Sequence, residues 1–454
     1  FGSKSGDYEN HTPGTLDSDP LIYTLATDQV NAIRWLSPGK VMAVGTVGGE
    51  FIISGSTTSD PLTPTNVRVV REGTRGSHTH KPVRVDNTVI FIQRQQRKVR
   101  EFTYTFQTDS FESPDLTILS PQVAKGGISE IVFQQEPNTT IWGTKVDGQL
   151  VGLTYLRDQQ VIAWHRHKIG GVFGECKITV ADFANIATGT PLIFTKSDGK
   201  SVTVASTTGT AAASEFKTQT SNNATATNLK NAINALADFT ATVSSAVVTV
   251  KETLRPGAAP LTVATADKVR RAVVSQSIAV VESLSVIPSS SNGEEELWMI
   301  VKRTVNGVTR RYIEFMEARF DLEESSTKEN AFFVDSGLSY DSTATATITG
   351  LNHLESETVS ILGNGSVYAN QSITSGSISG LDPTVTEAQI GYPFESIVKT
   401  LRPEAGGDDG TAQGKTKRVF NVTVRFMQTL GAKASSDGVN YDEIQFRRGA
   451  SPMD

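Results

Sequence analysis

The feature that most constrains the fold is a stretch of short alternating segments joined by tight turns, from Gly126 to Gly171. Between its second and third segments, the Asp147-Gly148 pair predicts a two-residue hairpin turn in which both central residues have positive φ. One sheet of this kind has two open edges and cannot bury both of its faces alone. We therefore expect related sheets elsewhere in the chain. Strands are predicted at 128–134, 140–145, 150–156 and 161–167.

Three further stretches carry the same pattern, around 30–53, 82–106 and 280–320. The hairpin turns fall near residues 48, 95, 147 and 306, so the first three are separated by about 50 residues, a spacing typical of β-propeller blades. The sequence therefore predicts a mainly β fold with a four-bladed β-propeller-like domain. This domain is expected over 26–172 and 273–325, after an N-terminal arm or lead-in at 1–25.

The long gap between the third and fourth copies has the size of one small domain, about 100 residues. Its composition shifts to Ala, Thr and Ser, and Ser221 predicts the start of a helix at 224–237 with apolar residues at helical spacing. Strands are expected on both sides of 197–199 and in a hairpin at 239–250. Residues 173–272 are therefore predicted to form an inserted α+β domain.

The remaining chain is predicted to be all β. Short alternating runs over 326–400 indicate a barrel-like or sandwich-like module. The glycine-rich, charged stretch 401–417 is expected to be a mobile loop, and 418–429 alternates over twelve residues like a long strand. We assign 401–454 to this loop and to C-terminal strands.

Charge and cysteine content exclude several classes of function. A formal net charge of −6 over 454 residues argues against a protein whose main task is to grip nucleic acid phosphates, but not against a surface past which DNA slides. No run of 18 apolar residues occurs, so no membrane span is expected. The single cysteine, Cys176, rules out an intramolecular disulfide and is expected to be buried. Because the chain begins with Phe1, we expect a native N-terminal segment to be missing.

Two His-x-His sequences, His78-Thr79-His80 and His165-Arg166-His167, place imidazoles on one face of a strand, which is one way to build a metal site. No third ligand accompanies them at a defined spacing. We interpret them as polar contacts at strand ends, with Trp164 facing the core. No metal site and no cofactor are predicted.

Acid/base catalysis needs only two carboxylates, and propellers often carry glycosidases. Carboxylates at hairpin turns and solvated strand edges are common without any catalytic role, and the candidates lie at such positions. The acidic run at 294–296 indicates a solvated loop. No phosphate-binding glycine loop, nucleophile elbow or nucleophile beside a base occurs. We therefore predict no catalytic residue and no enzyme activity. The carboxylate candidates are Glu130, Glu136, Asp147, Asp158 and Glu314.

Basic residues cluster in four places, and two interpretations remain open. Charges on edge strands block unwanted pairing, which is the simpler explanation. Transient contact with phosphates in a channel is the alternative. The clusters are Arg68, Arg71 and Arg75; Arg94, Arg97, Lys98 and Arg100; Lys302, Arg303, Arg310 and Arg311; and Lys415, Lys417 and Arg418.

The run VDNTVIFIQRQQRKVREFTYTF at 85–106 resembles the tail nozzle proteins, or tail tubular protein B family, of short-tailed bacteriophages. The resemblance covers most of the chain outside the insertion, which is similar instead to small decoration-like domains of phage structural proteins. Further similar segments are DLT at 115–117, QQEP at 134–137, GLTYLRDQ at 152–159, VIAWH at 161–165, AFFVDSGLSY at 331–340 and GKTKR at 414–418.

The resemblance implies a structural virion protein, assembled in the host cytoplasm as a homohexameric tube below the portal and adaptor. Its partners would be the adaptor, tail fibre proteins and double-stranded DNA passing without sequence specificity. The family carries no catalytic residues to transfer. Loop residues are then expected to line or gate the channel: Arg402, Glu404, Asp408, Asp409, Lys415, Lys417 and Arg418.

Two alternatives remain open. A polysaccharide-degrading propeller needs two carboxylates that converge on a pocket. A carbohydrate-binding or receptor-binding tail protein needs exposed aromatic side chains, whereas Trp35, Trp142, Trp164 and Trp298 recur within the predicted strands and are expected in the core.

Overall fold

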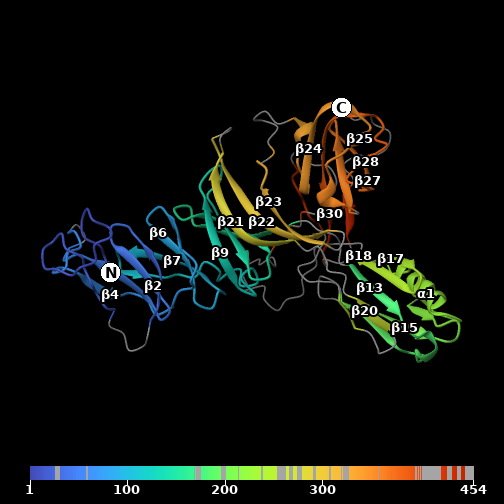
Figure 1. Cartoon of the computed structure of the whole chain (residues 1–454), viewed down its shortest axis with the longest axis horizontal. Coiled ribbons are helices and arrows are strands. Elements are labelled where there is room, and N and C mark those ends of the chain that lie inside the picture. The colour runs from blue at the N-terminus through green and yellow to red at the C-terminus, as the bar shows by residue number, and fades with distance from the viewer. Residues whose placement is uncertain are drawn as a thin grey trace. The chain divides into compact units, whose positions relative to one another are not determined.

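The structure is a computed structural model, and it forms two compact units, Phe1–Glu395 and Ser396–Asp454. The fold is mainly β, built from several small sheets, nearly all antiparallel (Figure 1). The structure describes residues 1–25, 31–57, 60–167, 169, 175–195, 201–212, 214–236, 239–252, 262–264, 269–272, 279–289, 293–305, 308–318, 320, 327–355, 357–393, 396, 398, 400, 421–426, 432–436 and 441–444.

Three four-stranded sheets follow one another along the chain, and in each the strands pair in sequence order (Figure 1). The first sheet consists of β1 (Ile33–Ser37), β2 (Met42–Thr46), β3 (Glu50–Ser54) and β4 (Arg68–Arg71). The second consists of β5 (Val83–Val85), β6 (Thr88–Ile92), β7 (Val99–Thr105) and β8 (Ser110–Glu112). The third consists of β9 (Ile128–Gln134), β10 (Thr140–Lys145), β11 (Leu150–Leu156) and β12 (Val161–His167).

A fourth sheet lies beyond the insertion in sequence and has three strands in the described residues. They are β21 (Val280–Pro288), β22 (Glu295–Val305) and β23 (Val308–Phe315). The centre of β22 is a run of five apolar residues, 297–301, which is consistent with a strand. The fourth predicted copy is thus a meander like the other three, one strand shorter.

Successive sheets pack face to face through separate apolar cores. Val89 and Phe91 of β6 pack with the first sheet, while Ile90 and Ile92 belong to the core shared with the third sheet. In the same way, Ile141 of β10 faces the second sheet and its neighbour Trp142 joins the core of the fourth. Because both faces of these central strands are covered, β6 and β10 are buried along their whole length.

Polar contacts also connect the sheets at the first two junctions. Arg84 donates from its guanidinium Nη1 to the Pro38 carbonyl oxygen across the first junction, at 2.7 Å. The Tyr155 hydroxyl donates to the Glu101 carboxylate across the second, at 2.8 Å. Three separate apolar cores join the four sheets into a stack, and no closed propeller is identified among the described residues.

The inserted segment forms two four-stranded sheets around one helix and its own core. One sheet has the order β17-β18-β13-β20 and the other β16-β15-β14-β19, in which β15 and β16 pair in parallel. Helix α1 (Asn222–Asn234) begins after Ser221, whose hydroxyl accepts from the Ala224 N–H, and it buries Leu229 and Ile233. The strands are β13 (Glu175–Val180), β14 (Pro191–Thr195), β15 (Ser201–Thr207), β16 (Glu215–Lys217), β17 (Phe239–Ser244), β18 (Val247–Glu252), β19 (Thr262–Ala264) and β20 (Val269–Ala272).

The module after the fourth sheet is a four-stranded sheet of order β24-β29-β26-β27 with a two-stranded pair, β25 and β28. Its core includes Leu354, Ile361 and Ile390. In the second unit, β30 (Ala432–Ala434) pairs with β31 (Asp442–Ile444). The module strands are β24 (Asp335–Thr345), β25 (Thr347–Ile348), β26 (Thr358–Gly363), β27 (Ser366–Ser372), β28 (Ile378–Ser379) and β29 (Val385–Tyr392).

Several local predictions need correction. The Asp147-Gly148 turn is a three-residue loop between Lys145 and Gln149, and of the pair only Gly148 has positive φ, 84°. The predicted strand at 418–429 is absent over its described part, 421–426. Helix α1 spans 222–234 instead of 224–237. The predicted turns at 197–199 and 306–307 lie outside the described residues, and β4 and β8 were not predicted because they are short and polar.

Candidate interaction surface

The residues predicted to line or gate a channel lie outside the part of the chain that the structure describes. This applies to all seven of them: Arg402, Glu404, Asp408, Asp409, Lys415, Lys417 and Arg418. They remain a sequence prediction.

His165 and His167, on β12, form a contacting pair. The His165 Nδ1 lies 2.7 Å from the His167 Nε2, and both rings pack against Trp142. Burial lowers the pKa of both imidazoles, that of His167 to about 4 with a further contribution from His165. Among the described residues, no three His, Cys, Asp or Glu side chains lie close enough to hold a metal ion. The pair is thus a neutral polar contact in the interior of the stack.

The two imidazoles of the second His-x-His sequence, His78 and His80, contact different partners. The His80 Nε2 lies 3.0 Å from the Ile131 carbonyl oxygen, whereas the His78 Nε2 lies 2.8 Å from the Gln96 side-chain nitrogen. His80 therefore connects the loop before β5 to the third sheet. Both imidazoles serve the packing of the second and third sheets.

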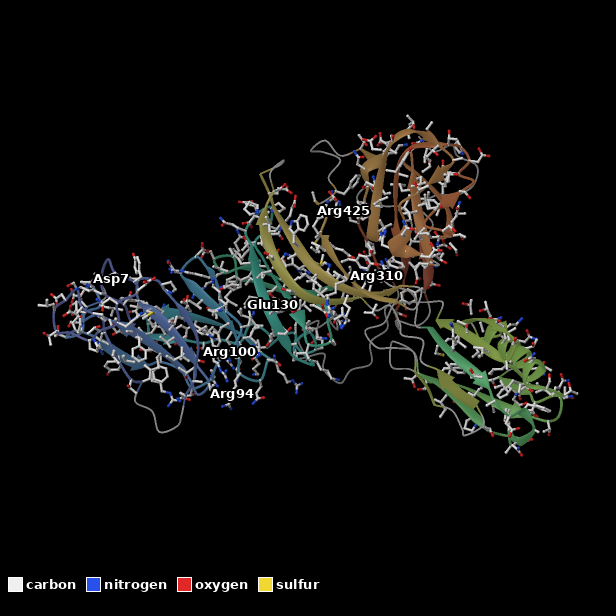
Figure 2. The ribbon with its side chains drawn as sticks, in the orientation of Figure 1. Asp7, Arg94, Arg100, Glu130, Arg310 and Arg425 are labelled. Carbon is white, nitrogen blue, oxygen red and sulfur yellow. The ribbon has the colours of Figure 1, made fainter. Side chains whose placement is uncertain are left out.

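Three of the five candidate carboxylates bind other parts of the fold. Glu130 projects from β9 and accepts from the Leu284 N–H of the fourth sheet, at 3.2 Å (Figure 2). Asp147 lies 3.0 Å from the Lys145 ammonium, and Glu314 accepts both guanidinium nitrogens of Arg303 at 2.7 Å. No contact of Glu136 or Asp158 with another of these carboxylates occurs in the described residues. The structure does not bring a pair together as glycoside hydrolysis requires.

Many of the clustered basic residues also have internal partners. Arg100 is buried on β7 and donates to the Gln93 side chain and the Ser113 carbonyl, at 2.6 and 2.5 Å (Figure 2). Lys98 pairs with Asp115 at 2.7 Å, and Arg71 donates to the Gly48 carbonyl at 2.8 Å. These side chains satisfy loop carbonyls and carboxylates and do not form an open basic stripe.

Sequence reasoning missed a buried carboxylate, Glu50, at the start of β3. Burial raises its pKa, and it accepts from the Arg75 N–H at 3.3 Å and the Ser77 hydroxyl at 3.4 Å. Its backbone also bonds that of Gly73, where a side chain would come within 2.2 Å of the Glu50 carboxylate. Glu50 thus anchors the 72–77 loop. No sequence signal distinguished it from the solvated glutamates at other hairpins.

The fourth sheet has one covered and one exposed face. On β22, Leu297, Met299 and Val301 face the third sheet. The residues between them on β22, and the residues of β23 that pair with those, face away from it. On the exposed face Ile300 opposes Ile313 and Trp298 opposes Phe315, with ring centroids 5.1 Å apart. Trp298 is half-buried, so its prediction as a core residue is only partly correct. We define the exposed face as Ile287, Trp298, Ile300, Ile313 and Phe315.

The covered face of the same sheet continues into the following module. The Arg303 side chain is 1% exposed, pairs with Glu314, and lies over the Tyr392 ring at 5.8 Å. The Ser336 hydroxyl of β24 donates to the same Glu314 carboxylate at 3.3 Å. A buried charge pair of this kind fixes geometry more than it stabilises.

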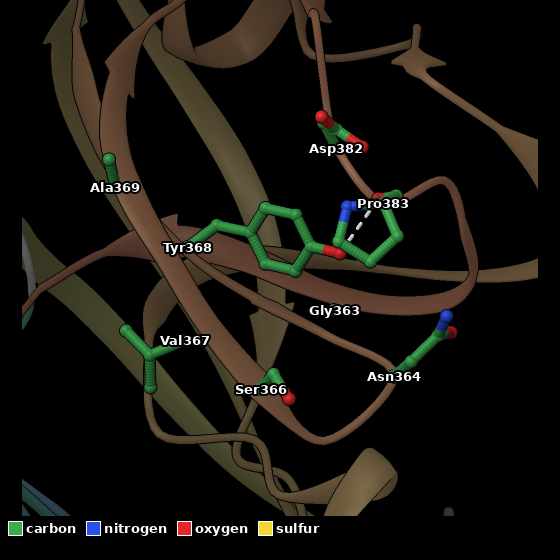
Figure 3. A pocket seen from close by; sticks show the side chains of 8 residues that line it. All are labelled: Gly363, Asn364, Ser366, Val367, Tyr368, Ala369, Asp382 and Pro383. Carbon is green, nitrogen blue, oxygen red and sulfur yellow. Dashed lines mark hydrogen bonds between the residues drawn. The ribbon is translucent and has the colours of Figure 1, made fainter.

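The module carries an open hollow of about 330 Å³ (Figure 3). The Tyr368 hydroxyl donates to the Pro383 carbonyl at 2.8 Å, so it is already bonded within the protein. Asn364 accepts from the backbone of Thr386 and Glu387. The hollow therefore offers few free polar groups to a sugar. It is lined by Gly363, Asn364, Ser366, Val367, Tyr368, Ala369, Asp382 and Pro383.

Comparison with known proteins adds no assignment: no family model matches the chain, and no curated protein matches it significantly. Among the described residues, no helix is both long and apolar enough to cross a membrane.

Proposed function

We propose that this protein is a structural subunit of the tail nozzle of a short-tailed bacteriophage, extending and gating the channel through which DNA is ejected. The proposal rests on the sequence resemblance given above. In it the subunits form a homohexamer that contacts the adaptor and the tail fibre proteins. The four sheets would be blades of a propeller-like domain, a view supported by their meander order and face-to-face packing.

The observation that supports a structural role best is the exposed apolar face of the fourth sheet. Ile313 is 75% exposed and Phe315 47%, on the face of β23 that also carries Arg311, 65% exposed and paired with Glu282. Meanwhile the candidate acid/base carboxylates Glu130 and Glu314 are engaged within the fold. A subunit of an assembly is expected to expose an apolar surface that a partner covers. Its polar groups are expected to take part in packing.

The proposed mechanism is geometric. Ejected DNA must pass quickly, and each Lys or Arg contact with phosphate would increase drag, so a subunit with a net charge of −6 suits a conduit. The 401–417 loop would narrow the channel before infection, and a rearrangement triggered by receptor binding would open it.

Phage particles that lack the protein test this function. The proposal expects that such particles package DNA and then lose it, because the channel below the adaptor is not closed. Particles that retain their DNA would argue against a gate. Hydrolysis of host surface polysaccharide by the purified protein would favour the polysaccharide-degrading alternative instead.

A further inference from the structure

The hollow in the module after the fourth sheet is built around an aromatic ring that the fold holds in place. The Tyr368 hydroxyl donates to the Pro383 carbonyl oxygen at 2.8 Å, and the side chain also packs against the apolar core of the module. Gly363 lets the ring lie close to β26, because a Cβ at that position would stand 2.8 Å from the Tyr368 Cε2. Tyr368 is half-buried, so part of it remains open to the hollow that it lines (Figure 3).

The residues that line the hollow carry one charge, and it is negative. Asp382 lies beside the Tyr368 ring, is exposed, and has no hydrogen bond or ion pair among the described residues (Figure 3). No lysine, arginine or histidine is among the lining residues. The aliphatic stem of Lys328 passes beside Gly365 in the neighbouring turn, but the described residues show no ion pair between Lys328 and Asp382. The Asp382 carboxylate is therefore open to a cation from elsewhere.

A ring and a carboxylate together select the chemistry of a ligand. The face of an aromatic ring attracts a cation, because its π electrons make that face negative. A guanidinium can in addition stack flat on the ring while its N–H groups donate to carboxylate oxygens. An alkylammonium has the charge but not the planar shape. The combination therefore favours arginine over lysine.

We propose that the hollow binds an arginine side chain of a partner protein, with the guanidinium stacked on the Tyr368 ring and its N–H groups donating to the Asp382 carboxylate. The Ser366 hydroxyl, which also lines the hollow, can accept a further N–H. A volume of about 330 Å³ lies within the range of ligand-binding pockets. Arginine is also frequent among the residues that dominate the affinity of protein interfaces. The inference goes beyond the proposed function, because binding at this site does not depend on ring formation.

Nuclear magnetic resonance of the full-length protein with ring-labelled tyrosine tests the site. The probe is N-acetyl-arginine N-methylamide, and its citrulline counterpart is the matched control, because it has nearly the same shape without the charge. The signal of Tyr368 is identified by its loss in Tyr368→Phe. We expect the arginine compound to shift this signal in a saturable way and the citrulline compound to leave it unchanged. Equal shifts with both compounds, or no shift with either, overturn the proposal. Tighter binding of the lysine counterpart overturns it as well, because stacking would then contribute nothing.

A charge-neutral variant provides a second test. Asp382→Asn keeps the size of the side chain and should weaken binding of the arginine compound about fivefold. Asp341→Asn, which removes an exposed carboxylate on β24 of the same module, should leave the affinity unchanged. Thermal denaturation of Asp382→Asn should match that of the parent protein, because this carboxylate has no partner among the described residues. Equal affinity of the parent protein and Asp382→Asn contradicts the proposed contact.

Discussion

Ile300 and Ile313 face each other across β22 and β23, and both lie in solvent, at 40% and 75% exposure. The next residue along β22, Val301, is fully buried against the third sheet. The face of Ile300 and Ile313 also carries Lys302 and Arg311, both paired with Glu282. The two faces of this strand pair thus differ both in burial and in charge.

The first prediction compares these two faces. Ile313→Thr should change the free energy of unfolding of the single chain by less than about 0.5 kcal/mol, because the side chain is already hydrated. Val301→Thr should cost about 1–3 kcal/mol, since it buries a hydroxyl without a partner. Chemical denaturation of both variants measures the difference. If Ile313→Thr cost more free energy of unfolding than Val301→Thr, the face that carries Ile313 would be the buried face.

The second prediction concerns Gly152, over which the His165 ring lies. A Cβ at this position would come within 2.0 Å of the imidazole Cε1, so Gly152→Ala should destabilise the fold by about 1–3 kcal/mol. Gly209→Ala is a matched control, because its Cβ would meet only the Thr207 hydroxyl at 3.7 Å. Thermal denaturation should also show partial rescue in the Gly152→Ala/His165→Ala double variant. Additive losses in that variant would contradict a clash with the ring.

The third prediction is a pH dependence that arises from His167. Its pKa of about 4 in the fold lies below the ordinary value of 6.5, so the unfolded chain binds more protons between these values. The contribution to stability is therefore complete above about pH 6.5 and is lost as the pH falls to about 4, by an amount on the order of 2 kcal/mol. His167→Gln should flatten the stability profile in this window, and His11→Gln, on the exposed arm, should not. An unchanged slope in His167→Gln would rule out this assignment.

The fourth prediction concerns the Arg303–Glu314 pair. Glu314→Ala leaves a guanidinium that is 1% exposed without its carboxylate and should cost about 3–5 kcal/mol. Glu282→Ala removes the partner of Arg311, which is 65% exposed, and should cost much less, because solvent screens an exposed ion pair. Denaturation in urea compares the two. Similar costs would mean that the buried pair does not hold the fourth sheet to the module after it.

The strands that could be predicted are those whose alternation is strong. The four strands of the third sheet begin and end at the predicted residues, because each is a run of six or seven residues bounded by clear turns. β4 and β8 escaped prediction since their edge positions leave polar residues such as Arg68 and Glu112 in the strand. At 421–426, the described part of the predicted strand 418–429, the alternation is not accompanied by a strand.

Sites were harder to predict than strands. The His165–His167 contact followed from i, i+2 spacing, but its neutral character depends on burial beside Trp142, which belongs to the core shared with the fourth sheet, more than a hundred residues away in sequence. Glu50 gave no signal at all, because its burial depends on the loop that folds over it at 72–77.

Electron cryomicroscopy of the assembled phage particle tests the central claim most directly, by locating this chain and counting its copies. We predict six copies in a ring below the adaptor, around a central channel. A chain found only at the tips of fibres, or present as isolated copies away from the DNA path, would contradict it.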